Sequence, residues 1–328
     1  MKQICIVGSG AAGLLVLYNL EKQGVDPARI TVIDPTHNGG DLKFKWSTVR
    51  SNTTWRQIFE AVPSRTSFAI PYCHLNPDEP IELRFAIQYL MDVTQDYRSK
   101  TFLRTDKVKN AHVENGKWIL FCEKRQGPLL FDVVFFCQGS EPKWLDLPFP
   151  SIPLDIALDK KRITEHVKQG QHILVFGTAH SGPLVVKNLL ELGARVTNFY
   201  ATEKPFYFAS EGEYDGIKYD AANIAREILN GSYSNLTMES VQDMASLIRA
   251  SKSAEACIYA CGFEPRIISP EWRRYDGKTG RIENTTGAWG FGIAYPNTAP
   301  DGVHWDVSIP AFQTHIQTQI PDILASLQ

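Results

Sequence analysis

The sequence predicts an α/β protein in which a strand–helix–strand unit occurs twice. Three observations carry this prediction: a glycine-rich turn between an apolar run and a helical pattern near residue 10, a second copy of the same arrangement near residue 180, and a later apolar run, 256–261, that we expect to return the chain to the first domain. A length of 328 residues suits two domains better than one.

The first unit has the pattern of a dinucleotide-binding turn. An apolar run, 4–7, leads into Gly8-Ser9-Gly10-Ala11-Ala12-Gly13. In this G-x-G-x-x-G pattern the first glycine permits the tight turn, the second lets a pyrophosphate approach the backbone, and the third lets the helix pack on the sheet. The start of the helix offers free N–H groups and a positive dipole end to phosphates. The alternative is a glycine-rich turn in an α/β domain that binds no nucleotide.

An acidic residue completes this first pattern. Asp34 ends the second apolar run and lies 21 residues after Gly13. A carboxylate at this spacing accepts hydrogen bonds from a ribose diol. The sequence therefore predicts a first nucleotide site made of the turn 8–13 and Asp34.

The second unit repeats the first. An apolar run, 172–176, precedes Gly177-Thr178-Ala179-His180-Ser181-Gly182, and a helical pattern follows. The last turn glycine and the glycine that closes the helix have the same spacing in both copies, Gly13 to Gly24 and Gly182 to Gly193. Two copies predict two Rossmann-like domains whose dinucleotide sites face each other.

The second turn departs from the first in two ways. Ala179 replaces the middle glycine, so its methyl group crowds a phosphate, and no carboxylate ends the following strand at 198–200. An acid there would repel a 2′-phosphate, so its absence, with Lys204 nearby, favours NADPH over NADH. His180 is a further candidate for contact with a phosphate or ribose; the alternative is a helix-start residue without a ligand. A degenerate second copy that binds nothing is also possible.

Composition limits the classes of partner. The net charge of −2 gives no reason to expect nucleic acid or an anionic membrane as a partner. No apolar run approaches the roughly 20 residues that span a bilayer, and the first apolar stretch ends at Gly8, which is unlike a signal peptide. The six cysteines form no C-x-x-C pair, so we expect a reduced, cytoplasmic protein without a disulfide framework or a metal site.

The remaining segments predict the organisation of the chain. Residues 35–75 read as a long irregular loop, 81–98 as a helix, 101–137 as strands with a hairpin at Asn115-Gly116, and 311–327 as a final helix. Four prolines between 142 and 153 mark a linker. We expect one domain over 1–155 and 255–328, with the other, 156–254, inserted into it.

This layout resembles the flavoproteins with two dinucleotide-binding domains and, among them, the flavin-containing monooxygenases. The resemblance covers nearly the whole chain. It depends on the two turns with Asp34, on Gly39-Gly40, on Ser51-Asn52-Thr53 and on Ala260-Cys261-Gly262-Phe263-Glu264-Pro265. It implies FAD in the first domain and NADP, or NAD, in the inserted one. The chain departs from the family in lacking a clear F-x-G-x-x-x-H fingerprint.

The resemblance also implies roles for single residues. Asn52 is the candidate catalytic residue, beside the flavin ring and the nicotinamide ribose; the alternative is a loop asparagine in a turn. Asp306 would face the ribityl chain, or else act as a capping acid, and Val108 would contact adenine through its backbone, or else pack in the core. The other positions expected to contact FAD are Pro35, Gly40, Asp41, Trp46, Cys137 and Gly139.

The implied activity is that of an FAD-dependent NAD(P)H oxidoreductase. The resemblance favours a monooxygenase in which a C4a-hydroperoxyflavin, formed with molecular oxygen, oxygenates a small substrate containing sulfur, nitrogen or a ketone. Alternatives are a quinone or flavin reductase or an oxidase, and a non-catalytic FAD-binding protein with a degenerate second site. A disulfide reductase is disfavoured, because Cys257 and Cys261 in one strand would lie about 13 Å apart.

Overall fold

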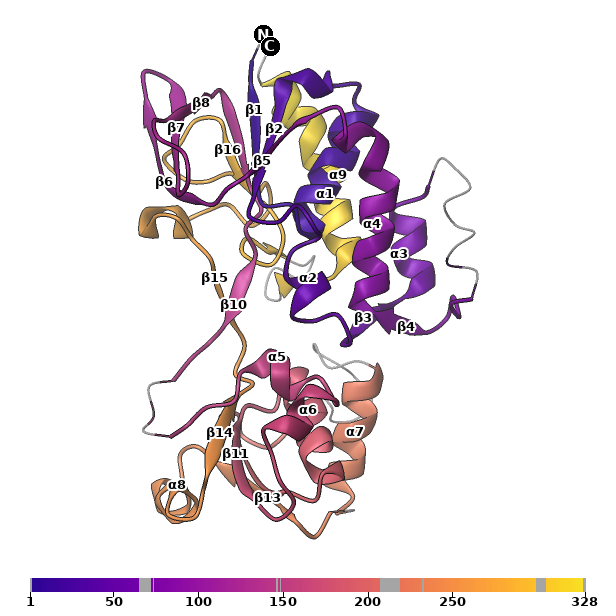
Figure 1. Cartoon of the computed structure of the whole chain (residues 1–328), viewed down its shortest axis with the longest axis vertical. Helices are drawn as coiled ribbons and strands as arrows, with labels where there is room; N and C mark the ends of the chain where they lie inside the picture. The colour runs from indigo at the N-terminus through magenta and orange to yellow at the C-terminus, as the bar shows by residue number, and fades with distance from the viewer. Residues whose placement is uncertain are drawn as a thin grey trace. The chain divides into compact units, whose positions relative to one another are not determined.

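The computed structural model describes residues 2–64, 72, 74–145, 147, 149–206, 219–231, 233–298 and 305–326. The chain forms two compact units (Figure 1). Unit 1 consists of Met1–Ser47, Thr53–Ser140 and Pro265–Gln328, and unit 2 consists of Thr48–Asn52 and Glu141–Glu264.

Unit 1 is built on a five-stranded sheet whose neighbouring strands are all parallel. The strand order is β16-β9-β1-β2-β5. Short runs of β-branched and aromatic residues form its buried strands. The bounds are β1 (Ile4–Val7), β2 (Ile30–Asp34), β5 (Phe102–Thr105), β9 (Val133–Phe136) and β16 (Ala288–Gly290).

Both faces of this sheet are covered. Because side chains alternate along a strand, Ile4 and Ile6 pack in one core cluster while Cys5 and Val7 pack in another. The first cluster lies under the helices α1 (Ala11–Lys22), α4 (Leu83–Arg98) and α9 (Ile309–Ala325), which gather on one face in Figure 1. The second lies under an antiparallel sheet of β6 (Val108–Glu114), β7 (Lys117–Cys122) and β8 (Leu129–Phe131).

The predicted hairpin and helices of unit 1 are confirmed. Asn115 and Gly116 connect β6 to β7 with positive φ angles of 51° and 74°, the backbone that a two-residue hairpin turn requires. The predicted helices at 81–98 and 311–327 appear as α4 and α9.

The expectation of an irregular loop over 35–75 is wrong for much of its length. This part contains α2 (Asp41–Phe44), β3 (Arg50–Thr54) and α3 (Trp55–Ala61), and β3 pairs with β4 (Pro80–Glu82). The helix α3 forms because Thr54 and Gln57 make a capping box at its start, while Trp55 and Ile58 are buried. Residues 65–71 and 73 lie outside the described residues.

Unit 2 repeats the plan of unit 1 with a parallel sheet of order β13-β12-β11-β14. The strands are β11 (His172–Phe176), β12 (Arg195–Tyr200), β13 (Leu236–Ser240) and β14 (Ala256–Tyr259). The helices are α5 (Leu154–Ala157), α6 (Ser181–Glu191), α7 (Tyr219–Leu229) and α8 (Met244–Ser251).

The strand β14 corrects one expectation. The run 256–261 was expected to return the chain to the first domain, but β14 pairs in parallel with β11 and so belongs to the sheet of unit 2. The chain returns one strand later, through β15 (Phe263–Pro265), which forms a two-stranded sheet with β10 (Ser140–Pro142).

The two sheets repeat each other down to single hydrogen bonds. The order β9-β1-β2-β5 corresponds to β14-β11-β12-β13. Gly8 donates its N–H to the carbonyl of Ile33, and Gly177 donates to that of Phe199, both at 2.8 Å. These parallel sheets confirm the predicted α/β fold class and its internal duplication.

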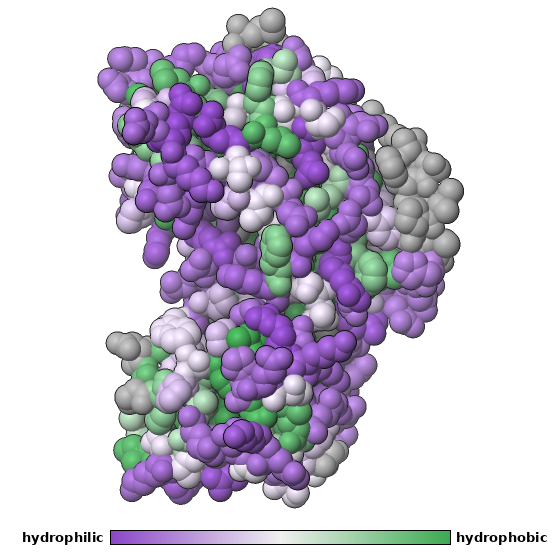
Figure 2. All heavy atoms as spheres, in the orientation of Figure 1, coloured by the Kyte–Doolittle hydropathy of each residue, from purple (hydrophilic) through white to green (hydrophobic). Residues whose placement is uncertain are grey.

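Short elements complete the fold. They are η1 (Pro27–Arg29), η3 (Arg162–Glu165), η5 (Pro270–Arg273), β17 (Asn297–Thr298) and β18 (Trp305–Asp306). Polar residues cover most of the face of unit 1 that Figure 2 shows. Among the described helices, none combines the length and the apolar character needed to cross a lipid bilayer.

Candidate functional site

The outer glycines of the first turn are required by the fold itself. Gly8 has φ 101°, and a Cβ there would lie 2.4 Å from the carbonyl oxygen of Cys137. A Cβ on Gly13 would lie 2.0 Å from the carbonyl oxygen of Gly8. Neither position therefore accepts a side chain, whether or not a ligand is present.

The middle glycine is different. Gly10 has an ordinary φ of −74°, and a Cβ there would come no nearer than 3.9 Å to another atom, the carbonyl oxygen of Gly39. The protein alone gives no steric reason for a glycine at this position. The space beside Gly10 is bounded by the start of α1, where no side chain caps the backbone N–H groups, and such a helix start is suited to bind an anion.

Asp34 organises the turn as well as ending β2. Its carboxylate is 6% exposed and accepts hydrogen bonds from the backbone N–H groups of Ser9, Thr36 and His37, each at 2.8 Å. Burial raises the pKa of Asp34, but these donors outweigh burial, so the net shift of the pKa is downward. The sequence indicated a ribose ligand and gave no sign of this bonding to the turn.

Residues from two other segments lie at the first turn. The loop of Gly39 and Gly40 approaches it, because a Cβ on Gly40 would lie 3.3 Å from the Cα of Gly10. Cys137 contributes its backbone carbonyl against Gly8, while burial raises the pKa of its thiol above the ordinary value. The structure thus brings together the predicted Gly8–Gly13, Asp34, Gly40 and Cys137.

Asp41 has a partner that the sequence did not reveal. It begins α2, and its carboxylate accepts a hydrogen bond from the guanidinium of Arg266. Arg266 also donates to the carbonyl of Gln138, one residue before Gly139. Gly139 has φ 72°. The only available signal was that Arg266 directly follows the 260–265 segment that carries the resemblance.

The second turn repeats the outer contacts of the first. Gly177 has φ 112°, and its Cβ would lie 2.3 Å from the carbonyl oxygen of Ala260. A Cβ on Gly182 would lie 2.4 Å from the carbonyl oxygen of Gly177. Ala179 takes the place of Gly10, the one position where the fold itself leaves room for a methyl group.

The register of unit 2 identifies the counterpart of Asp34. Val7 pairs with Ile33 in unit 1 and Phe176 pairs with Phe199 in unit 2, so Tyr200 stands where Asp34 stands. The exposed Lys204 follows four residues later. This half therefore presents no carboxylate at the end of its second strand.

Asn198 holds the second turn in place. This residue is fully buried, and its side-chain amide donates to the carbonyls of Val175 and Gly177, both at 3.0 Å. The sequence suggested only that Asn198 was not an acid. Thr178, the residue after Gly177, is buried at the turn, and His180 immediately precedes α6.

Solved structures share this arrangement over the length of the chain. A bacillithiol disulfide reductase from Staphylococcus aureus is 13% identical, with a TM-score of 0.69 and 100% of this chain and 99% of that chain covered. A flavin-containing monooxygenase from Stenotrophomonas maltophilia is 12% identical, with a TM-score of 0.65 and the same coverage. The ornithine N-hydroxylase of Kutzneria sp. 744 is 12% identical, with a TM-score of 0.64 and 100% of both chains covered.

The chain has the fold of the FAD/NAD(P)-binding oxidoreductases. The resemblance drawn from the sequence is thereby confirmed at the level of the fold. No family model and no curated protein matches the sequence.

Two further predicted residues, Val108 and Asp306, lie in other elements of unit 1. Val108 begins β6 and is buried in the core between the two sheets of unit 1. Asp306 pairs in β18 with Asn297 and accepts a hydrogen bond from Ser308, the residue that caps α9. Val108 packs in the core, which was the alternative given for it, whereas Asp306 does not itself cap α9. Contact with a cofactor remains a prediction for each.

The structure also gives the positions of three other predicted residues: Asn52, Trp46 and Pro35. Asn52 is half-buried in β3, within the Thr48–Asn52 segment that clusters with unit 2. Trp46 is 8% exposed and follows α2, where its backbone N–H donates to the carbonyl of Asp41. Pro35 is exposed next to Asp34.

The described residues contain neither a group of His, Cys, Asp and Glu arranged to hold a metal nor a disulfide. The five described cysteines are free. Cys73 lies outside the described residues.

Proposed function

We propose that this protein is an FAD-dependent NAD(P)H oxidoreductase that binds FAD in unit 1 and a nicotinamide nucleotide in unit 2. The observation that carries the proposal is Gly10. Its backbone is ordinary and its Cβ position is empty of protein atoms, so the absence of a side chain serves a ligand. A pyrophosphate beside uncapped helix N–H groups has the chemistry that this space requires.

A second feature of the first turn suits the same ligand. The hydroxyl of Ser9 is buried and has no hydrogen-bond partner among the described residues. A phosphate oxygen would accept a hydrogen bond from this hydroxyl, and a buried donor without an acceptor is costly. Asp34 would hold the turn by its bond to Ser9 and receive the adenosine ribose at the end of β2.

The names of two structural neighbours support the choice of cofactors. The Kutzneria ornithine N-hydroxylase is described with reduced FAD and NADP⁺, and the Stenotrophomonas protein is a flavin-containing monooxygenase. For the second site, Tyr200 in place of an acid and the exposed Lys204 favour NADPH over NADH, because no carboxylate opposes a 2′-phosphate.

The finer proposal is a monooxygenase that transfers one oxygen atom to a small substrate. Bound FAD would supply redox chemistry between NADPH and molecular oxygen. The chain would bind and orient the nucleotides through the two turns, Asp34 and Asn198. Asn52 is the proposed catalytic residue, since a side-chain amide can donate to a flavin carbonyl and orient a nicotinamide.

One experiment tests the cofactor and the reaction together. We expect the purified chain to be yellow and to lose its flavin absorbance when NADPH is added without air. After air is admitted, hydrogen peroxide is measured against NADPH consumed. A monooxygenase forms less peroxide than the NADPH it consumes once a suitable sulfur, nitrogen or ketone compound is present.

Other outcomes select the alternatives. Peroxide equal to NADPH in every condition indicates an oxidase, and quinone reduction without peroxide indicates a reductase. Flavin that neither NADPH nor NADH reduces indicates a non-catalytic FAD-binding protein, for which Ala179 would be the reason. A colourless protein that takes up no FAD would overturn the proposal.

A further inference from the structure

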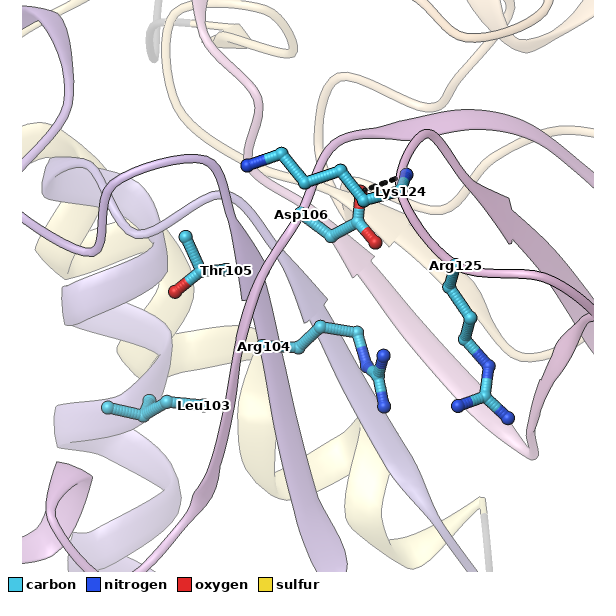
Figure 3. A pocket seen from close by; sticks show the side chains of 6 residues that line it. All are labelled: Leu103, Arg104, Thr105, Asp106, Lys124 and Arg125. Carbon is cyan, nitrogen blue, oxygen red and sulfur yellow. Dashed lines mark hydrogen bonds between the residues drawn. The ribbon is translucent and has the colours of Figure 1, made fainter.

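A hollow with a mainly cationic lining lies in unit 1, at the C-terminal ends of β5 and β7. A hollow of about 460 Å³ is lined there by Leu103, Arg104, Thr105, Asp106, Lys124 and Arg125 (Figure 3). Arg104 comes from β5, while Lys124 and Arg125 come from the turn after β7. Three cationic side chains and one carboxylate therefore share the lining.

Asp106 is the one carboxylate in the lining, against three cations. Within the described part of the chain, Arg104, Lys124 and Arg125 form no ion pair, although several other surface cations do, such as Lys109 with Glu123 and Arg56 with Asp78. In Figure 3 the guanidinium groups of Arg104 and Arg125 lie on the same side of Asp106, and Lys124 extends across Asp106 toward Thr105. Like charges gathered around one hollow attract anions and repel each other.

Asp106 offsets one of the three positive charges and also fixes the geometry of the hollow. It is 3% exposed, and its Oδ1 accepts hydrogen bonds from the backbone N–H groups of Lys107 at 2.8 Å and Lys124 at 3.0 Å. Glu123 adds a backbone bond to the carbonyl of Lys107. The turn that carries Lys124 and Arg125 is thereby fastened to the end of β5, next to Arg104.

We propose that Arg104 and Arg125 form a binding site for a multiply charged phosphate, of the pyrophosphate type. Guanidinium groups bind phosphate oxygens in a bidentate manner, so two arginines match two linked phosphates. The amine of Lys124 lies on the other side of Asp106 (Figure 3) and contributes to the site only through its charge. The lining of the hollow contains no residue of the turn 8–13. The hollow lies next to the end of β2, because the backbone carbonyl of Asp34 accepts a hydrogen bond from the N–H of Asp106 at 3.2 Å.

The test is calorimetric titration of the full-length protein, carrying whatever flavin it retains, with inorganic pyrophosphate at physiological ionic strength. Arg104→Ala and Arg125→Ala should each weaken binding about fivefold or more, the loss expected when one unit charge near the ligand is removed. Asp106→Asn keeps Oδ1 as an acceptor and removes a repelling charge, so it should strengthen binding. Lys100→Ala, an exposed cation outside the hollow, should leave it unchanged.

The arginine variants should weaken binding and Asp106→Asn should strengthen it. These opposite effects distinguish a change in charge from misfolding, because a damaged fold would weaken binding in all variants. A second titration with ADP identifies the source of the phosphates. If ADP binds and both Arg104→Ala and Arg125→Ala weaken its binding, the ligand is a nucleotide. If pyrophosphate binds and ADP does not, the ligand is a free oxyanion. Each result supports the site. No binding by the wild type, or binding that neither arginine variant weakens, would overturn it. Flavin content, measured on each sample, reports separately on the proposed function.

Discussion

At the scale of single residues, the glycines of the two turns divide into those that the fold needs and one that it does not. Gly8, Gly13, Gly177 and Gly182 would each place a Cβ within 2.4 Å of a backbone carbonyl oxygen. Gly10 would place its Cβ no nearer than 3.9 Å to any protein atom. Substitution at these positions therefore separates folding from ligand binding.

For Gly10→Ala we expect a melting temperature close to that of the wild type and a large loss of bound FAD. An added methyl group costs about 1–3 kcal/mol where two groups are in close contact, which corresponds to about a 5- to 150-fold loss in affinity. Flavin absorbance per protein and thermal unfolding measure the two effects. Gly13→Ala is the contrast: it should lower stability itself. Full flavin content in Gly10→Ala would contradict the proposed first site.

Ala179→Gly makes the reverse change in the second turn. Removing the methyl group gives this turn the same middle residue as the first, so we expect NADPH to bind more tightly. The dissociation constant for NADPH is the measurement, with flavin content as the control because unit 1 is untouched. An unchanged constant would indicate that the nucleotide, if it binds, does not approach Ala179.

Asp34→Asn should destabilise the protein in a pH-dependent manner. The carboxylate accepts hydrogen bonds from the backbone N–H of Ser9 through Oδ2 and from those of Thr36 and His37 through Oδ1. The side-chain NH2 of an asparagine would face at least one of these N–H groups, donor against donor, at a cost of about 1–3 kcal/mol. The folded-state pKa of Asp34 is lowered. Its contribution is therefore complete above the unfolded pKa of about 3.9 and disappears as the pH falls through the lower, folded value.

Urea unfolding of wild type and Asp34→Asn at several pH values checks this sign. The difference in the free energy of unfolding should be largest near neutral pH and should shrink below about pH 4. A difference that stays constant with pH would show that the charge of Asp34 does not contribute.

At the scale of elements, the hairpin with a defined turn was predicted well, whereas one apolar run was assigned to the wrong sheet. The two positive φ angles at Asn115-Gly116 were implied by residue type alone. The run 256–261 was recognisable as a strand, but its partner depends on which sheet edge is open. In the structure this strand, β14, pairs in parallel with β11, and the paired residues are more than 80 positions apart in the sequence.

The capping box of α3 was readable and was missed. Thr54 accepts from the N–H of Gln57 at 3.3 Å, and the side chain of Gln57 accepts from the N–H of Thr54 at 2.9 Å. The surrounding polar residues favoured a loop, and the three-residue spacing of the cap was the stronger signal.

Thr54→Ala should remove this cap. We expect a loss of about 1 kcal/mol in the free energy of unfolding, measured by urea denaturation. Thr54→Ser keeps a hydroxyl acceptor and should retain most of the stability. Equal losses in both variants would assign the effect to packing of the threonine methyl group instead.

At the scale of the whole molecule, duplication was the feature best predicted from the sequence. Glycine spacing and apolar runs are local, so both turns and both strand pairs were recognisable. Contacts that join distant segments were not: Arg266 with Asp41, and the amide of Asn198 with Gly177, depend on side-chain directions that no pattern records. The cationic hollow of Arg104 and Arg125 was missed for the same reason.

The division into units predicts that they can be separated. β10 and β15, through which the chain leaves and re-enters unit 1, are hydrogen-bonded neighbours, so a short glycine-serine link should join Ser140 to Pro265. We expect this shortened protein to fold and retain FAD, and the fragment 141–264 to unfold cooperatively and bind NADPH alone. Circular dichroism and flavin absorbance are the measurements; FAD found with the fragment would reverse the assignment.

The carbonyl oxygens of Cys137 and Ala260 lie against Gly8 and Gly177. This packing limits which substitutions such chains can accept during evolution. A descendant that abandoned its coenzyme would still be obliged to keep the outer members of each signature, since architecture alone demands them. Only the central member would be released from selection. Searches that weight all three glycines equally will therefore count abandoned pockets as working ones.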